Sequence, residues 1–409
     1  MLKNYFKIAI AVLKRRKFFT FISLFGISLT LTILMVATAL VDKMFNPGYP
    51  DYNQNRSLYV ERIEIKNSKE GWVNMSNLSF YFFERYVSKL KTVSKMAISS
   101  GQKSSNAYIN NKKLVIDYKY TNADYWNVLA YKFLEGKAYG DKEIKSADRV
   151  AVISKKTKEA YFGDKKSVVG QYISADNINY RVIGVVDNVS GSVRNFTGGM
   201  YLPYTLSRDS KDTGLMGSYN AVLLARTEND VSKMKKEFAQ MMKKVPIPPD
   251  FDRIYCNADE FKTSVTRRLA GNSTSNGVAN VITFGSIFVL LFLLLPTINL
   301  VNINITRIME RSSEIGVRKA FGASSKILVY QFIVENLILT FIGGIIGIFL
   351  SVLVIYLINE SDYVSNFSLS INLTVLFLSL LSCVFFGLIS GVYPAWRMSK
   401  LNIVKALKA

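Results

Sequence analysis

Histidine is absent from the 409 residues of this sequence, and cysteine occurs only twice. Without an imidazole the chain can build neither a Ser–His–Asp triad nor a Cys–His dyad, and it cannot bind zinc through histidine. Cys256 lies in a polar stretch and Cys383 in an apolar one, so we expect no disulfide framework. These absences exclude several common classes of hydrolase and metalloenzyme.

The glycine-rich motifs that bind nucleotides are also missing. Gly136-Lys137 has neither the upstream glycine nor the following hydroxyl of the G-x-x-x-x-G-K-[ST] motif. No dinucleotide fingerprint follows a predicted strand, there is no G-x-S-x-G elbow, and no motif pairs the acidic residues for hydrolysis. We therefore expect no catalytic residues, no metal site and no cofactor, and any energy the protein uses must come from a partner.

Long uncharged runs are what the chain does have. Apolar residues make up 49% of it and charged residues 20%, which indicates a few membrane spans joined to a sizeable soluble domain. The four predicted spans are residues 18–41, 278–304, 328–358 and 371–395. The first also suits a signal peptide, but its 24 residues exceed the roughly 7–15 of a typical apolar signal region. We expect it to be retained.

Residues 42–277 are polar and mixed, and they predict a large α+β domain of two lobes. Strands are predicted at Ser57–Ile65, Lys113–Tyr118, Val150–Ile153, Tyr180–Val186 and Ala221–Ala225. Helices are predicted at Ser79–Lys91, Thr157–Phe162 and Asp230–Lys243. The fold class is therefore an α+β membrane protein with four transmembrane helices and this domain between the first and second.

Basic residues predict the orientation of the chain in the membrane. Residues 1–17 hold six Lys or Arg, residues 305–327 hold five and the tail 396–409 holds four, whereas the connection 359–370 holds none. The positive-inside rule then places both termini in the cytoplasm and residues 42–277 outside. Residues 1–17 also predict an amphipathic helix on the lipid surface, or only a basic flank that orients the first span. The outside location argues against a nucleic-acid partner.

The segment between the second and third spans, 305–327, carries charges at helical spacing. Glu314 and Arg318 lie four residues apart in the favourable acid-first order, and Gly322 suits the end of a helix. A short docking helix and an ordinary basic cytoplasmic loop both fit this pattern.

Small residues recur at four-residue spacing in the last two spans. Gly343 and Gly347 form one such pair, and a second stripe lies in the fourth span. Such stripes let two helices approach closely in a membrane. The residues predicted to pack are Gly343, Gly347, Ser379, Cys383, Gly387 and Gly391.

Several stretches together resemble the four-span permease subunits of MacB/FtsX-type ABC transporters. The segment RSSEIGVRKAFGAS (311–324) is similar to that family's signature after the second span, and PAWRMSKLNIVKAL (394–407) to its C-terminal motif. In the outer domain, VAVISKKTKEAYFGDKKSVVGQYI (150–173) and YRVIGVVDNV (180–189) resemble the MacB-like periplasmic core.

The resemblance implies that the 305–327 segment is a coupling helix that docks on a separate ABC ATPase, which binds the ATP. The residues it implies for this contact are Arg311, Glu314, Ile315, Gly316, Arg318, Lys319 and Gly322. It further implies an inserted lobe near 110–205, a second permease copy in a homo- or heterodimer, and a bacterial inner-membrane location. A periplasmic adaptor and an outer-membrane channel are further partners found in the family.

The function implied is mechanotransmission, with export of a drug, peptide or lipoprotein-like substrate driven by the partner ATPase. The alternative is an FtsX-like regulator that transports nothing and controls a cell-envelope process such as a cell-wall hydrolase. The long, two-lobed outer domain favours the exporter. The sequence names neither the substrate nor the identity of the ATPase.

Overall fold

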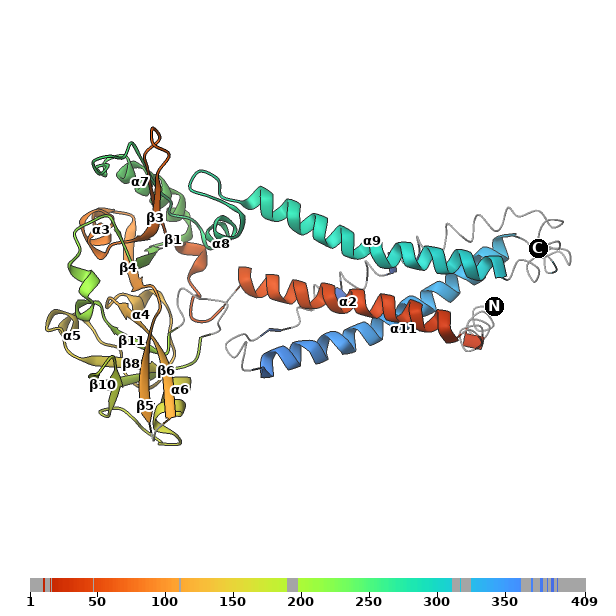
Figure 1. Cartoon of the computed structure of the whole chain (residues 1–409), viewed down its shortest axis with the longest axis horizontal. Coiled ribbons are helices and arrows are strands. Elements are labelled where there is room, and N and C mark those ends of the chain that lie inside the picture. The colour runs from red at the N-terminus through yellow and green to blue at the C-terminus, as the bar shows by residue number, and fades with distance from the viewer. Residues whose placement is uncertain are drawn as a thin grey trace. The chain divides into compact units, whose positions relative to one another are not determined.

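The computed structural model describes residues 10–11, 15, 17–46, 48–109, 112–189, 198–310, 317, 325–361, 369–370, 376–377, 381, 384–385 and 388. The chain divides into two compact units (Figure 1). One combines Met1–Lys43 with Ile282–Ala409, and the other is Met44–Val281. We call the second the outer unit and describe each by itself.

Long helices make up the described part of the first unit. They are α2 (Lys17–Phe45), α9 (Val278–Glu310) and α11 (Ser325–Glu360). Within the described residues, Lys17–Phe45 and Ile333–Glu360 are long and apolar enough to cross a membrane, and Val278–Phe292 is a shorter apolar stretch. The predicted helix 1–17, the fourth span 371–395 and the tail 396–409 lie outside the described residues except at a few positions.

The helix that holds the second predicted span is longer than the span. The span is predicted to end at residue 304, and α9 continues to Glu310. No glycine or proline occurs between Pro296 and Glu310, so nothing in the backbone stops the helix when the sequence becomes polar. The first residues of the predicted 305–327 segment are therefore the last turns of α9.

The outer unit contains a sheet of 14 strands with helices packed on it. The strands are β1 (Ser57–Val60), β2 (Ile63–Lys66), β3 (Val73–Leu78), β4 (Val93–Ser100), β5 (Lys103–Ile109), β6 (Lys112–Thr121), β7 (Phe133–Gly136), β8 (Val150–Ser154), β9 (Tyr172–Ala175), β10 (Ile178–Val186), β11 (Met200–Pro203), β12 (Met216–Gly217), β13 (Tyr219–Ala225) and β14 (Arg253–Cys256). The α-helices are α3 (Phe80–Arg85), α4 (Tyr125–Val128), α5 (Asp141–Lys145), α6 (Lys155–Phe162), α7 (Val231–Met242) and α8 (Phe261–Ala270). Short 3-10 turns are η1 (Gln54–Arg56), η2 (Val87–Lys89), η3 (Tyr204–Leu206), η4 (Arg208–Lys211) and η5 (Glu228–Asp230).

The strand order is β14-β2-β3-β13-β4-β6-β11-β8-β10-β7, with β1 on β13, β12 on β3, β5 on β6 and β9 on β10. Most pairs are antiparallel, and β6–β11 and β8–β10 are parallel. The strands β4 and β6 pair only at Ser99 and Thr121. The sheet is therefore narrow at this point, which separates two groups of strands. The group beyond this point comes from residues 103–203.

The strand β13 separates two hydrophobic cores. All its residues are buried. Leu223 and its alternate neighbours join the core that contains Phe238 of α7, whereas Val222 and Leu224 join the core that contains Phe261 of α8. Side chains alternate between the faces of a strand, so one buried strand can contribute to both cores.

One predicted strand is wrong, because it forms two separate strands in the structure. Ser57–Ile65 was expected to be continuous, but β1 ends at Val60 and β2 begins at Ile63. The two strands have different partners, because β1 pairs with β13 while β2 pairs with β3 and β14. The break leaves Glu61 and Arg62 outside the ladder. The predicted helix Ser79–Lys91 is likewise two pieces, α3 and η2, with Ser79 as the N-cap of the first.

Candidate functional site

The predicted ATPase-docking residues lie outside the described part of the chain, in which Val317 is the only residue placed between 311 and 324. The same holds for Ser379, Cys383, Gly387 and Gly391 of the fourth predicted span. Two places that the structure does describe bear on how a movement could pass along the chain. They are the contact between α2 and α11, and the part of the outer unit where the chain enters and leaves it.

Two glycines bring α11 against α2. A Cβ added at Gly343 would lie 2.8 Å from Ile27 Cγ2, and one at Gly347 would lie 2.8 Å from Leu31 Cβ. Real Cβ atoms do not approach so closely, so a larger residue would push the helices apart. The two residues of each contacting pair are the same number of positions apart in the sequence. The pairs are Ile27 and Gly343, Leu31 and Gly347, and Ala39 and Ile355. The two helices therefore run parallel.

A buried hydroxyl strengthens this contact. Thr32 is nearly inaccessible, and its Oγ1 lies 2.8 Å from Ser28 O in its own helix and 3.3 Å from Gly347 O in α11. The Gly347 carbonyl also accepts from the Ser351 hydroxyl at 2.6 Å. Polar contacts of this kind hold helices together where no water competes.

In the part of the outer unit where the chain enters and leaves it, Tyr59 of β1 makes contacts in both directions. Its phenol donates to the carboxylate of Asp51, which follows α2 in the chain and is fully buried. The other Asp51 oxygen has no hydrogen-bond partner among the described residues. Burial raises the pKa of Asp51 to about 6, and the Tyr59 hydrogen bond opposes part of that rise.

The backbone of Tyr59 also pairs with Asp259, which precedes α8. Tyr59 N donates to Asp259 O at 2.7 Å, and Asp259 N donates to Tyr59 O at 3.0 Å. The Tyr59 ring packs edge-to-face on Phe261 at a centroid distance of 5.2 Å. Tyr59 thus connects the segment that follows α2 with the segment that leads to α9.

Asp259 and Arg267 fix the loop that leads into α9. Arg267 of α8 binds both carboxylate oxygens of Asp259, at 2.5 and 3.2 Å. Its Nη1 also donates to the carbonyls of Asn272 and Ser275, at 2.6 and 3.0 Å. The guanidinium therefore holds residues 271–275 against the body of the outer unit.

The first turn of α9 is fastened to α8 as well. Asn280 Nδ2 donates to Ala270 O at 2.8 Å, and Thr266 Oγ1 donates to Asn276 O at 2.9 Å. Gly277 has φ +73°, and a Cβ there would lie 2.4 Å from Thr266 O. Only glycine fits this turn, so the chain passes from α8 to α9 through a short, well-held loop.

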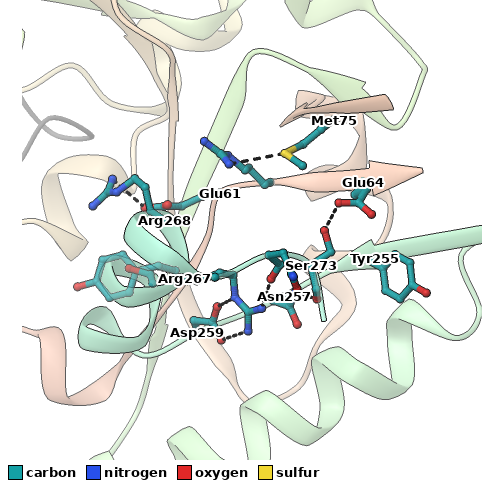
Figure 2. Close-up of a pocket in the computed structure, with 14 residues that line it drawn as sticks. Glu61, Glu64, Met75, Tyr255, Asn257, Asp259, Arg267, Arg268 and Ser273 are labelled. Atoms are coloured by element: carbon teal, nitrogen blue, oxygen red, sulfur yellow. Dashed lines mark hydrogen bonds and ion pairs between the residues drawn. The ribbon is translucent and has the colours of Figure 1, made fainter. Parts of the chain in front are cut away.

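A pocket of about 130 Å³ lies between this loop, α8 and the strands β2 and β14 (Figure 2). Its charged lining residues are Glu61, Arg62, Glu64, Asp259, Arg267 and Arg268. Two of the acids are paired, Asp259 with Arg267 and Glu61 with Arg268 at 3.7 Å. Ser273 of the loop donates its hydroxyl to Glu64 of β2. Sequence reasoning did not identify this pocket, because its walls come from residues nearly 200 positions apart.

The described residues contain no group of His, Cys, Asp and Glu side chains that could hold a metal ion. Burial raises the pKa of the Cys256 thiol and lowers that of Lys119, on β6, to about 8. Neither side chain lines the pocket. We call the contacts of Asp51, Tyr59, Asp259 and Arg267, all within the outer unit, the joint, and the small pocket adjoins them.

Comparison with known proteins gives the class and then the family. Residues 286–403, the C-terminal part of the chain, match the FtsX-like permease C-terminal family, a class of permeases. Residues 20–241, more than half of the chain, match the MacB-like periplasmic core domain. The chain belongs to the MacB/FtsX family of ABC transporter permeases.

The curated relatives differ in length. The "Uncharacterized ABC transporter permease YknZ" of Bacillus subtilis (strain 168) is 26% identical over 329 residues, which cover 80% of this chain and 79% of the relative. The macrolide export ATP-binding/permease protein MacB of Campylobacter jejuni (strain 81-176) is 27% identical over 276 residues, 66% of this chain and 41% of the relative. The match to this MacB protein thus spans less than half of its length.

Crystal structures of the outer regions of two such proteins align with part of this chain. The extracellular domain of YknZ aligns with 45% of this chain and 92% of its own, at 19% identity and a TM-score of 0.35. The periplasmic region of MacB from Actinobacillus actinomycetemcomitans aligns with 53% and 94%, at 16% identity and a TM-score of 0.36.

Proposed function

We propose that this chain is the four-span permease subunit of an ABC exporter, and that it turns ATP hydrolysis by a separate ATPase into movement of its outer unit. Two permease copies and two ATPases form the working unit in the inner membrane, with both termini in the cytoplasm. The chain binds no ATP or other cofactor, and its substrate is a drug, a peptide or a lipoprotein-like molecule. A periplasmic adaptor and an outer-membrane channel complete the path.

The joint at Tyr59 and Arg267 is the observation that carries this proposal. Phe45, the last residue of α2, packs with the core that contains Phe261, and Asn280 in the first turn of α9 bonds to α8. Rigid, hydrogen-bonded connections carry a displacement, whereas flexible linkers absorb it. Within the outer unit, the residues that follow α2 and those that precede α9 are held by contacts of this kind.

The parallel contact of α2 and α11 supports the same proposal. Gly343 and Gly347 leave no space for the two helices to slide without side-chain repacking. A displacement of α11 at its Ser325 end is then shared with α2. In the proposed arrangement the ATPase acts on residues 305–327, a segment that runs from the end of α9 to the start of α11.

The test uses the purified chain with the ATPase that co-purifies with it. We expect no ATP hydrolysis by the chain alone and a changed ATPase rate in the complex. Glu314→Lys places two like charges at an i,i+4 spacing with Arg318 and mismatches the docking surface, which can cost several kcal/mol at an interface. It should abolish co-purification while the protein stays monodisperse.

Lys142→Glu is the matched control, since Lys142 is exposed on α5 of the outer unit. It should leave ATPase binding and stimulation unchanged. Normal coupling in Glu314→Lys, with loss in Lys142→Glu, would contradict the assignment of residues 305–327 as the docking segment.

A further inference from the structure

Among the residues that the structure describes, the pocket beside the joint contains one positive and one negative side chain that form no ion pair with each other or with another charge. Four of its six charged residues form the ion pairs Asp259–Arg267 and Glu61–Arg268. The remaining two are Arg62 and Glu64. Within the described residues, no ion pair involves either of them.

The contacts of these two side chains are weak or incomplete. An Arg62 Nη1 atom lies 3.6 Å from the Met75 thioether, the only side-chain acceptor it meets in the described part of the chain (dashed line in Figure 2). Sulfur is a weak acceptor, and a guanidinium has five N–H donors. Glu64 accepts one hydrogen bond, from the Ser273 hydroxyl, although a carboxylate can accept about four. Both groups can therefore bind a ligand without first breaking an ion pair.

The backbone places the two charges on the same side of the chain. Glu64 is the cross-strand partner of Met75, so these two side chains lie on the same face of the sheet, and the Arg62 guanidinium contacts the Met75 thioether. Two residues apart, Arg62 and Glu64 are at most about 7 Å from each other along the chain. A ligand with a positive and a negative group can lie along this stretch and reach both.

The size of the pocket limits the ligand. The volume accessible inside it is about 130 Å³. Drug-sized ligands occupy pockets of about 300–1,000 Å³. The pocket therefore suits a small charged ligand, or the charged end of a larger one.

We propose that this pocket binds a small zwitterion of the amino acid or dipeptide class. Its ammonium group is held by Glu64 and its anionic group by Arg62. The uncharged lining, which includes the Tyr255 ring and the Asn257 amide, contacts the part between the charges. An ethanolamine phospholipid headgroup has the same pair of charges, so a soluble zwitterion and a lipid headgroup are two sources of one chemistry.

A ligand bound in the pocket would change the contacts of the loop that leads into α9. Glu64 holds Ser273, and an ammonium ion bound at Glu64 competes with that hydroxyl. The ligand would thereby alter one of the contacts that fasten residues 271–275. This regulatory consequence rests on the proposed function, whereas binding itself does not.

The binding test uses the full chain in nanodiscs of phosphatidylcholine, without its ATPase, and isothermal titration calorimetry. The probes are glycylglycine, which carries both charges, N-acetylglycine, which carries only the anion, and glycinamide, which carries only the cation. We expect glycylglycine to bind at least about tenfold more tightly than either control, because each lost charge removes one charge-assisted hydrogen bond. Equal binding of all three, or no binding of glycylglycine and glycerophosphoethanolamine, would overturn the proposal.

Glycerophosphoethanolamine distinguishes the sources. Tighter binding of this probe than of glycylglycine would assign the pocket to a lipid headgroup, and the reverse order to a soluble amino acid or peptide.

Matched variants locate the site. Arg62→Gln and Glu64→Gln should each weaken binding of the preferred probe about tenfold or more. Arg85→Gln and Glu70→Gln remove exposed charges of the same outer unit that do not line the pocket, and they should change nothing. Unchanged binding in both pocket variants would contradict the assignment. Because no ATPase is present, this failure is separate from a failure of Glu314→Lys to uncouple the complex.

Discussion

Tyr59 and Asp259 exchange two backbone hydrogen bonds, of 2.7 and 3.0 Å, across 200 residues of sequence. Tyr59 follows the turn after α2, and Asp259 precedes the helix that leads to α9. The two ends of the outer unit are therefore tied to each other by the backbone itself. Side-chain contacts from Asp51 and Arg267 extend this tie in both directions.

Arg267→Gln should loosen the loop before α9. The Asp259–Arg267 pair is largely buried, and removing one partner of such a pair costs about 3–5 kcal/mol because a charge is left unpaired. We expect a lower unfolding temperature for the outer unit and faster amide hydrogen exchange in residues 271–277. Exchange measured by mass spectrometry shows whether the change is local.

Arg268→Gln is the control for that prediction. Arg268 lies one residue further along α8, but its partner Glu61 is 3.7 Å away and both side chains are more exposed. Exposed ion pairs contribute about 0–1 kcal/mol. Equal effects of the two substitutions would show that Arg267 has no special role.

Asp51 should make the stability of the protein depend on pH. Its pKa is about 6 in the folded protein against an ordinary 3.8, so the folded state binds the extra proton between these values. The stability it contributes is present below about pH 4 and is lost as the pH rises through 6. The shift corresponds to about 3 kcal/mol, at 1.36 kcal/mol per unit.

Asp51→Asn should remove this dependence. Between pH 4 and 7, the unfolding free energy of Asp51→Asn should rise relative to that of the wild type. The variant should therefore be relatively more stable at the higher pH. Tyr59→Phe removes the hydrogen bond that favours the charged carboxylate, so it should move the transition to higher pH. Parallel curves for Asp51→Asn and wild type would contradict the assignment.

Gly347→Leu should disrupt the contact between α2 and α11. The added Cβ alone would lie 2.8 Å from Leu31 Cβ and 3.0 Å from Ser28 O, and overpacking of this kind costs about 1–3 kcal/mol or more. We expect a lower thermal midpoint in detergent. Gly285→Leu is a matched change in α9, where a Cβ meets nothing within 4 Å, and its midpoint should stay close to that of the wild type.

Thiol labelling in intact cells checks the predicted orientation. A cysteine at Lys145, which is exposed on α5, should react with an impermeant maleimide, and one at Ser313 should not. Cys256 is a poor reporter, because burial raises the pKa of its thiol and leaves little reactive thiolate. Labelling at Ser313 without labelling at Lys145 would reverse the topology.

The sequence predicted the strongly periodic elements of the outer unit well. The apolar runs at Val150–Ile153 and Ala221–Ala225 lie in β8 and β13, and the helical spacing at Asp230–Lys243 lies in α7. It missed β3 and β5, whose residues VNMSNL and KSSNAYI are too polar to show alternation. These strands form because neighbours in the sheet supply their hydrogen bonds, which is tertiary information.

The contacts between α2 and α11, and those of Tyr59 and Arg267, were not predicted because they depend on the tertiary fold. The spacing of Gly343 and Gly347 indicated a close helix contact but not its partner, and the Thr32–Gly347 hydrogen bond joins residues 315 positions apart. Nothing local distinguishes Tyr59 or Arg267 from other aromatic or basic residues. Their roles follow from the folding of β1 beside the segment before α8, which no local pattern encodes.

The most direct test of the account is a distance measured in the whole complex. Spin labels are attached through a cysteine at Lys145 of each permease copy, in a background of Cys256→Ser and Cys383→Ser, with the cognate ATPase bound. Electron–electron double resonance then measures the distance between the two spin labels, first without nucleotide and then with ATP trapped in a hydrolysis-deficient ATPase. We predict that the distance between the two outer units changes on ATP binding and that Glu314→Lys abolishes the change. The same distance in both states of the wild-type complex would contradict mechanical coupling to the outer unit.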